Sequence, residues 1–140
     1  MNKMKTMRVN IQAARLLFLM SLLLAGCAVS QRAEKAGGRL HQVGLVWLKN
    51  AGSQEDQRRV VEAVHAFGKN IPEVKHASVG RTDGVGGAFS DTSYDVCFIL
   101  SFEDEAARLR YNESPVHLKA AQEVFLPLSR KLLFYRFVGE

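Results

Sequence analysis

The sequence predicts one α+β domain in which helices cover one face of an antiparallel sheet. Three observations predict this fold class. Strand-like and helix-like hydrophobic patterns follow one another from residue 41 to residue 138 in the order strand, helix, strand, strand, helix pair, strand. The second and third strands are separated by a glycine-rich loop rather than a helix. About a hundred residues make up this part of the chain, enough for one hydrophobic core and too few for two.

The first strand and the first helix are expected within residues 41–72. Residues 41–49 are rich in Val, Leu and Trp without helical spacing, which predicts a buried strand. Ser53, with Asp56 three residues later, resembles a capping box at a helix start. Apolar residues then recur at helical spacing until Gly68 and Pro72 end the helix. They are Val60, Val61, Val64 and Phe67.

Two strands and the loop between them come next. The helical spacing of apolar residues ends before residue 74, and residues 74–81 are predicted to form the second strand. The loop over residues 82–91 lacks the Gly-Lys-Ser/Thr ending of a phosphate-binding loop. Residues 94–102 are aromatic and β-branched throughout and predict the third strand.

A helix pair and a last strand complete the domain. Acidic residues 103–105 favour a helix start, and this helix runs to about residue 111. Ser114-Pro115 restarts a helix as cap and first-turn proline, and residues 131–138 form the fourth strand. Two split βαβ halves of this kind predict a ferredoxin-like sandwich. The arginines at 58, 59, 108 and 110 are assigned to solvated helix faces.

The face of the sheet that the helices leave uncovered is also expected to be apolar. Odd and even positions are both hydrophobic in residues 94–102 and 131–138. A matching sheet from a second copy of the chain is the simplest cover. The sequence therefore predicts a homodimer.

The charge of the domain excludes nucleic acid as a favoured partner. The chain carries nineteen Lys and Arg against fourteen Asp and Glu. Four of the basic residues precede Cys27, so fifteen remain against the fourteen acids that follow it. A nearly neutral domain without a basic cluster lacks the positive surface that phosphate backbones require.

The N-terminal residues have the composition of a bacterial secretory signal. Four basic residues and no acidic residue precede an apolar run over residues 16–26, which is too short for a stop-transfer helix. The segment Leu24-Ala25-Gly26-Cys27 resembles the lipobox, in which the cysteine is acylated and becomes the first residue of the mature protein.

The lipobox resemblance implies three segments: a signal peptide at residues 1–26, a lipidated tether at 27–40 and a folded domain at 41–140. Acyl chains on Cys27 would anchor the exported protein to the cell envelope. Because Ala28 rather than Asp follows the cysteine, the resemblance implies the periplasmic face of the outer membrane in a Gram-negative cell. Cys97 is then the only free thiol, so no internal disulfide can form.

Tyr111 and His117 are the candidate acid–base residues. His117 and the apolar positions 121, 124 and 128 are spaced four, three and four apart, which places the imidazole on the stripe that packs toward the sheet. If Tyr111 lies across the helix break, its phenol can hydrogen-bond the imidazole, and the pair could move a proton near neutral pH. A structural histidine that fixes the helix break is the alternative that the spacing leaves open.

We expect a modest, mostly apolar cavity between sheet and helices. Alternation places His41 and every second residue after it on one face of the first strand, and we assign that face to the cavity. The expected lining is His41, Val43, Leu45, Trp47, Phe98, Leu132 and Phe134, with Tyr111 and His117. Two histidines with no third ligand do not make a zinc site, so neither a metal nor another cofactor is expected.

Five short segments, in this order and spacing, resemble a known family. They are His41, Ile71-Pro72, Ser93-Tyr94-Asp95-Val96, the segment from Tyr111 to His117, and Lys131-Leu132-Leu133. On these residues the chain is similar to the stress-responsive A/B barrel (Dabb) family of the dimeric α/β barrel superfamily. The resemblance implies a ferredoxin-like fold, a homodimer and a role in stress response.

Some members of that family are plant polyketide cyclases that use a histidine and a tyrosine without a cofactor. Their Tyr-x-x-x-Pro-x-His segment matches Tyr111 and His117 here, and a histidine on their first strand corresponds to His41. Further polar pocket residues of the cyclases are replaced by Val64 and Val96, so the cyclases' substrate orientation does not carry over.

These observations favour an exported, lipid-anchored homodimer that binds a small hydrophobic or aromatic ligand. One alternative is a cofactor-independent enzyme that uses Tyr111 and His117 for an aldol-type cyclisation, a lyase step or an oxygenase step. The other is a structural envelope protein without a ligand.

Overall fold

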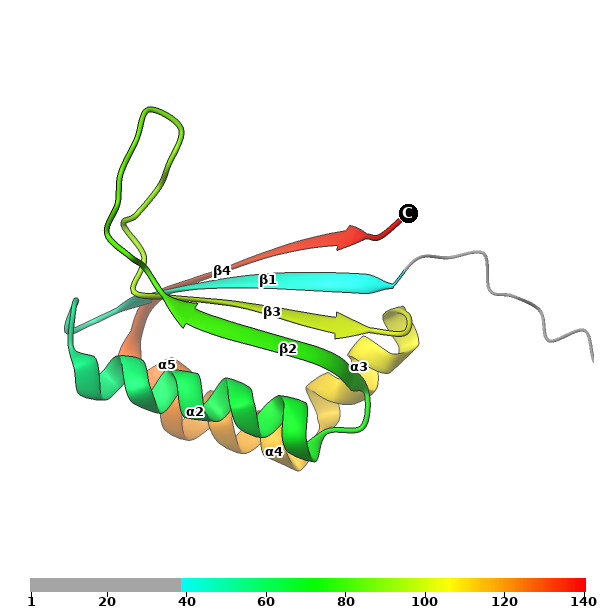
Figure 1. Cartoon of the computed structure of the whole chain (residues 1–140). Helices are drawn as coiled ribbons and strands as arrows, with labels where there is room; N and C mark the ends of the chain where they lie inside the picture. The colour runs from blue at the N-terminus through cyan, green and yellow to red at the C-terminus, as the bar shows by residue number, and fades with distance from the viewer. Residues whose placement is uncertain (1–38) are drawn as a thin grey trace, which may run out of the picture. The chain divides into compact units, whose positions relative to one another are not determined.

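The computed structural model describes residues 39–140, so the predicted signal peptide, Cys27 and most of the tether lie outside the described residues. Its sheet has four strands: β1 (Leu40–Leu48), β2 (Val74–Arg81), β3 (Val96–Phe102) and β4 (Ser129–Val138). They lie in the order β2-β3-β1-β4, and all neighbours are antiparallel. Figure 1 shows every labelled helix on the same face of this sheet. The predicted ferredoxin-like α+β fold is confirmed.

The first helix of the described chain, α2 (Gln54–Asn70), begins where the sequence predicted. The Ser53 hydroxyl accepts a hydrogen bond from the Asp56 backbone N–H at 3.2 Å and so caps the helix. Its buried side includes Val60, Val64 and Phe67. This side packs the helix against the sheet and fixes Phe67 above it.

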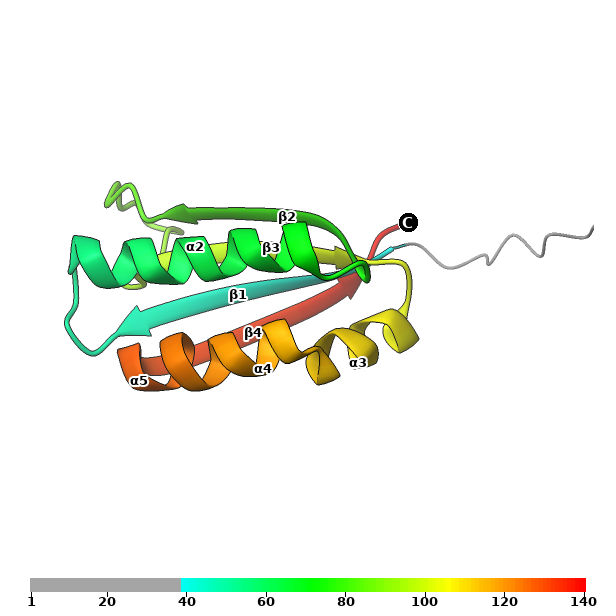
Figure 2. The ribbon, with the colours of Figure 1, turned by 90° about the horizontal axis from the view of Figure 1, so that it is seen from below.

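The second helical segment consists of α3 (Glu105–Glu113), α4 (Pro115–Ala120), a π-helical turn η1 (Ala121–Phe125) and α5 (Leu126–Leu128). Figure 2 shows α4 and α5 lying beside α2 beneath the sheet. The break between α3 and α4 falls at Ser114, and Pro115 occupies the first turn of α4, as predicted.

The end of this segment differs from the simple helix that the sequence predicted. Leu126 donates its backbone N–H to the carbonyl of Ala121, five residues earlier, which makes the π-turn. Pro127 has no N–H to donate to the Glu123 carbonyl four residues earlier. Arg59 of α2 instead donates to that carbonyl at 3.2 Å. Arg59 therefore supports the helix end and is not simply solvated.

The third strand begins at Val96, two residues later than predicted, and the residue before it, Asp95, stabilises a turn. Its carboxylate accepts hydrogen bonds from the backbone N–H of Leu48 at 2.8 Å and of Gly52 at 2.7 Å. Asp95 is only 6% exposed. It fixes the turn that follows β1, and β3 starts at the next residue.

The core lies between the sheet and the helices, and the other face of the sheet is open. The largest fully buried side chains are Phe67, Phe102, Leu48, Ile71 and Leu100. Ile99, Tyr135 and Phe137 are exposed, and they belong to strand positions that face away from the helices. Within residues 39–140, no helix has both the length and the apolar character needed to cross a bilayer.

Candidate functional site

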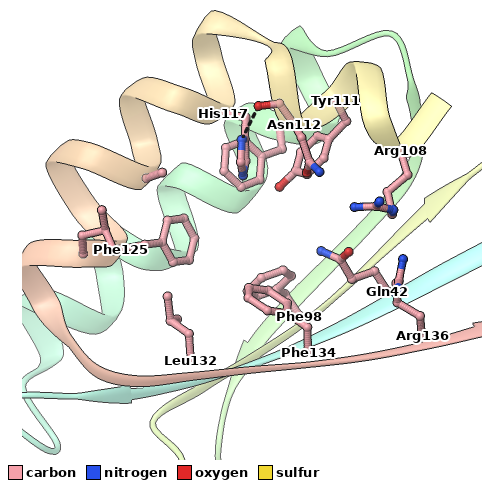
Figure 3. Close-up of a pocket in the computed structure, with 13 residues that line it drawn as sticks. Gln42, Phe98, Arg108, Tyr111, Asn112, His117, Phe125, Leu132, Phe134 and Arg136 are labelled. Carbon is pink, nitrogen blue, oxygen red and sulfur yellow. Dashed lines mark hydrogen bonds between the residues drawn. The ribbon is translucent and has the colours of Figure 1, made fainter. Parts of the chain in front are cut away.

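A cavity of about 470 Å³ lies between the sheet and the second helical segment. Figure 3 shows its apolar wall, which includes Phe98 and Phe134 on the sheet and Phe125 on the helical side. Tyr111 and His117 line it from the helices. A concave, largely apolar site with a few polar groups is typical of small-molecule pockets.

Alternation along β1 places a different set of residues in the cavity from the one predicted. Gln42 lines the cavity, and Gly44 and Val46 share its face of the strand. The assignment of His41, Val43, Leu45 and Trp47 to the lining is therefore wrong, whereas Phe98, Leu132 and Phe134 lie where predicted. The error follows from a sheet that is apolar on both faces, so alternation alone does not show which face meets the helices.

Two polar side chains of β1 that do not line the cavity, His41 and Trp47, have partners elsewhere. His41 Nδ1 lies 2.8 Å from the Ser101 hydroxyl, and its ring stacks on Phe137 with a centroid separation of 4.8 Å. The indole N–H of Trp47 donates to the Ser93 hydroxyl at 2.9 Å, and the Lys131 ammonium lies 4.2 Å from the centroid of its ring. Both residues thus contribute to structure outside the cavity.

His117 presents one basic nitrogen to the cavity. Its Nδ1 lies 3.1 Å from the backbone oxygen of Asn112. A carbonyl oxygen only accepts, so Nδ1 carries the proton and donates it to this bond. Nε2 is then unprotonated, and Figure 3 shows the imidazole projecting from α4 into the cavity. Burial lowers the pKa of His117, although the bond to Asn112 opposes that effect, so the ring is neutral near pH 7.

Tyr111 shares the cavity with His117 but does not bond to it. The two rings lie 4.5 Å apart between centroids and are inclined by 50°. Among residues 39–140 the phenol makes no hydrogen bond to the imidazole, whose Nδ1 is engaged by Asn112. Burial raises the pKa of Tyr111 well above its usual range. The phenol therefore stays protonated and can act only as a neutral hydrogen-bond partner.

The polar residues at one end of the cavity were not predicted from the sequence. Arg108, which was assigned to a solvated helix face, lines the cavity with a side chain only 13% exposed. Arg136 and Gln42 line the same end. Position along an amphipathic helix does not reveal such a role, because Arg108 lies at the edge of the buried face. Arg110, by contrast, is 59% exposed, as predicted.

Other reactive groups do not add to this site. Within residues 39–140 no three His, Cys, Asp or Glu side chains gather as a metal site would require. Cys97 is half-buried on the opposite face of the sheet, and burial raises the pKa of its thiol. A thiol with a raised pKa is a poor nucleophile.

Comparison with known proteins places nearly all of the described chain in one family. The sequence model of the Stress Responsive A/B Barrel Domain, Dabb, matches residues 40–138. No curated protein matches the chain.

Solved structures share the fold. A Dabb family protein with a ferredoxin-like fold from Mesorhizobium loti is 24% identical, with 74% of this chain and 98% of that chain covered and a TM-score of 0.61. A dimeric ferredoxin-like protein of unknown function from Thermobifida fusca is 20% identical, with 74% and 93% covered and a TM-score of 0.61. The hydroxynitrile lyase from Passiflora edulis is 20% identical, with 74% and 94% covered and a TM-score of 0.62. At these identities the similarity shows the fold alone.

Proposed function

The chain belongs to the stress responsive A/B barrel domain family, and from that premise we propose that it is a homodimer whose subunits each bind a small hydrophobic or aromatic ligand. The observation that carries this proposal is the cavity of about 470 Å³ beside His117. Aromatic side chains from both the sheet and the helices line it, so a flat apolar molecule would be in contact on both sides. A purely structural role would not require such a space.

Ligand binding is tested by a substitution that fills the cavity with a larger side chain. Ala121 lines it from η1, and Ala121→Phe should displace a ligand without removing any polar group. Ala106→Phe places the same ring at an exposed position of α3 and is the matched control. We expect titration with the fluorescent apolar probe 1-anilinonaphthalene-8-sulfonate to show binding to the wild type and to Ala106→Phe and at least tenfold weaker binding to Ala121→Phe. Equal binding to all three proteins would contradict the proposal.

The homodimer is supported by the open face of the sheet. Three large apolar side chains lie exposed on it: Ile99 is 37% exposed, Tyr135 56% and Phe137 52%. An exposed apolar surface of this kind on a small domain indicates a partner. The Thermobifida fusca protein with the same fold is described as dimeric. A second copy that packs its own sheet against this face would cover it symmetrically.

A second candidate function is proton transfer without a cofactor. The observation that favours it is the tautomer of His117, which leaves Nε2 as a base in the same cavity as the Tyr111 phenol. A lyase step on an aromatic hydroxynitrile suits this pair. His117 Nε2 removes the hydroxyl proton, the C–O bond becomes a carbonyl, and the C–CN bond breaks to release cyanide, which takes that proton back from the imidazolium and leaves as hydrogen cyanide.

Mandelonitrile is the probe for this second function, because its cleavage to benzaldehyde is followed by ultraviolet absorbance. We expect His117→Gln to lower the rate at least a hundredfold, whereas His65→Gln, at an exposed position of α2, should leave it unchanged. Wild-type protein that is no faster than His117→Gln would leave binding as the function.

Export and lipid attachment are proposed from the sequence alone. The lipobox-like segment that ends at Cys27 supports acylation of that cysteine and anchoring to the envelope, at the outer membrane in a Gram-negative cell. Metabolic labelling with an alkyne fatty acid should mark the wild type and Cys97→Ser but not Cys27→Ser. Labelling of Cys27→Ser would contradict the proposed site.

A further inference from the structure

The polar end of the cavity has its own chemistry, and, resting on the ligand binding proposed above, we infer that it is a carboxylate subsite. The ligand is then an apolar molecule that carries a single carboxylate group. Three elements supply the subsite: Gln42 comes from β1, Arg108 from α3 and Arg136 from β4. Figure 3 shows these side chains gathered at one end of the cavity, away from Phe125 and Leu132.

The subsite has an excess of positive charge. Arg108 donates from Nε and Nη2 to the two carboxylate oxygens of Glu105, at 2.9 and 2.6 Å. Arg136 reaches the same carboxylate only from Nη1, at 3.4 Å. Two guanidinium groups thus share one carboxylate, and none of the described residues that line the cavity is acidic. Counted together, Arg108, Arg136 and Glu105 carry one net positive charge.

Gln42 adds an amide that faces the cavity. The residue is 8% exposed, and its side chain has no hydrogen-bond partner among residues 39–140. Within residues 39–140 only the Ser129 hydroxyl is both enclosed and unpaired, so the unpaired Gln42 amide is open to the cavity, where it can hydrogen-bond to a polar group of a ligand. In the pairing of β1 with β4, Gln42 lies directly opposite Arg136. The amide and the guanidinium therefore approach a ligand from neighbouring positions on one face of the sheet.

This arrangement selects a monoanionic carboxylate with an apolar body. The two oxygens of a carboxylate match the paired N–H groups of a guanidinium and can also accept from the Gln42 amide. A neutral amide would leave the excess charge uncompensated, and a phosphate monoester would bring more negative charge than the single excess. The aromatic side chains of the rest of the cavity, Phe98 and Phe134 among them, suit a ring or a short alkyl chain.

Two matched pairs of probes test the subsite by isothermal titration calorimetry. They are 2-naphthoate with 2-naphthamide and decanoate with decanamide, so the members of each pair share an apolar body. We expect each acid to bind the wild type at least tenfold more tightly than its amide. Arg136→Gln should remove most of this preference while binding of the amides is retained, and Gln42→Leu should reduce it. Arg110→Gln removes an exposed arginine that pairs with Glu73 outside the cavity and should change nothing.

The outcomes separate this inference from the proposal on which it rests. If acids and amides bind equally, or if Arg136→Gln keeps the wild-type preference, the carboxylate subsite is overturned and the apolar cavity remains a binding site. If none of the four probes binds, both proposals fail. Circular dichroism of each variant shows whether it is folded, so that a loss of preference for the acid can be distinguished from unfolding.

Discussion

The ring of Phe98 on β3 lies directly over Gly44 on β1, so close that a Cβ atom on Gly44 would fall 2.3 Å from the ring Cζ atom. Gly44 is paired with Phe98 on one side and with Phe134 of β4 on the other. Both aromatic residues line the cavity. A glycine at this position lets the Phe98 ring cross the central strand and form part of the cavity wall.

Gly44→Ala should therefore destabilise the protein through overpacking. We expect a loss of about 1–3 kcal/mol in the free energy of unfolding, measured by urea denaturation. Shortening the clashing side chain with Phe98→Leu in the same protein should recover part of the loss. Gly80→Ala on β2, where an added Cβ meets no atom within 4 Å, should change stability by less than about 0.5 kcal/mol. Equal effects at the two glycines would show that the Phe98 contact is not responsible.

His117 should make stability depend on pH. Burial lowers the pKa of its imidazole in the folded protein, whereas in the unfolded chain the pKa returns to about 6.5. As the pH falls through that value toward the folded pKa, the unfolded chain takes up a proton that the folded protein resists, and stability decreases. Urea denaturation at pH 7.5 and 5.5 should show a larger loss for the wild type than for His117→Gln. His65→Gln should lose as much as the wild type, and an equal loss in all three would refute this role of burial.

Asp95 should be important for stability although it lies outside the cavity. Asp95→Ala leaves the backbone N–H groups of Leu48 and Gly52 without their acceptor. We expect a loss of about 3 kcal/mol by urea denaturation, because a charged acceptor is removed from a buried position. Asp83→Ala removes a carboxylate that accepts from Val85 in an exposed loop and should have little effect. A small effect of Asp95→Ala would mean that the turn after β1 does not need this carboxylate.

The open face of the sheet should control the oligomeric state. Ile99→Asp places a charge at its centre, and we expect size-exclusion chromatography with light scattering to show a dimer for the wild type and a monomer for the variant. Leu118→Asp introduces the same charge on α4, at a leucine that is 47% exposed and lies on the helical side. This control should remain dimeric. A monomeric wild type, or dissociation by both variants, would count against a dimer through the sheet.

Local chemistry made much of the fold predictable. The start of α2 at Ser53 depends on a side-chain cap next to it in the sequence, and the break before α4 depends on Pro115. The π-turn was not predictable in the same way, because the Glu123 carbonyl that Pro127 leaves unpaired is satisfied by Arg59 from another helix.

The cavity was predictable only in part. The helical spacing correctly placed His117 toward the sheet, and Phe98, Leu132 and Phe134 were found through their strand positions. Alternation grouped His41 with Val43 correctly, but the two apolar faces of the sheet gave no sign of which one meets the helices. The position of Arg108 depends on how α3 packs against the sheet, which is a tertiary property.

The central claim is that the cavity beside His117 holds a small apolar ligand. Native mass spectrometry of the protein purified from its own host measures this directly. The claim predicts a native wild-type mass above that of the same protein after denaturation, with a small molecule released, and no such difference for Ala121→Phe. If both proteins carry no small molecule, or both carry the same one, the cavity is not the binding site and the account is contradicted.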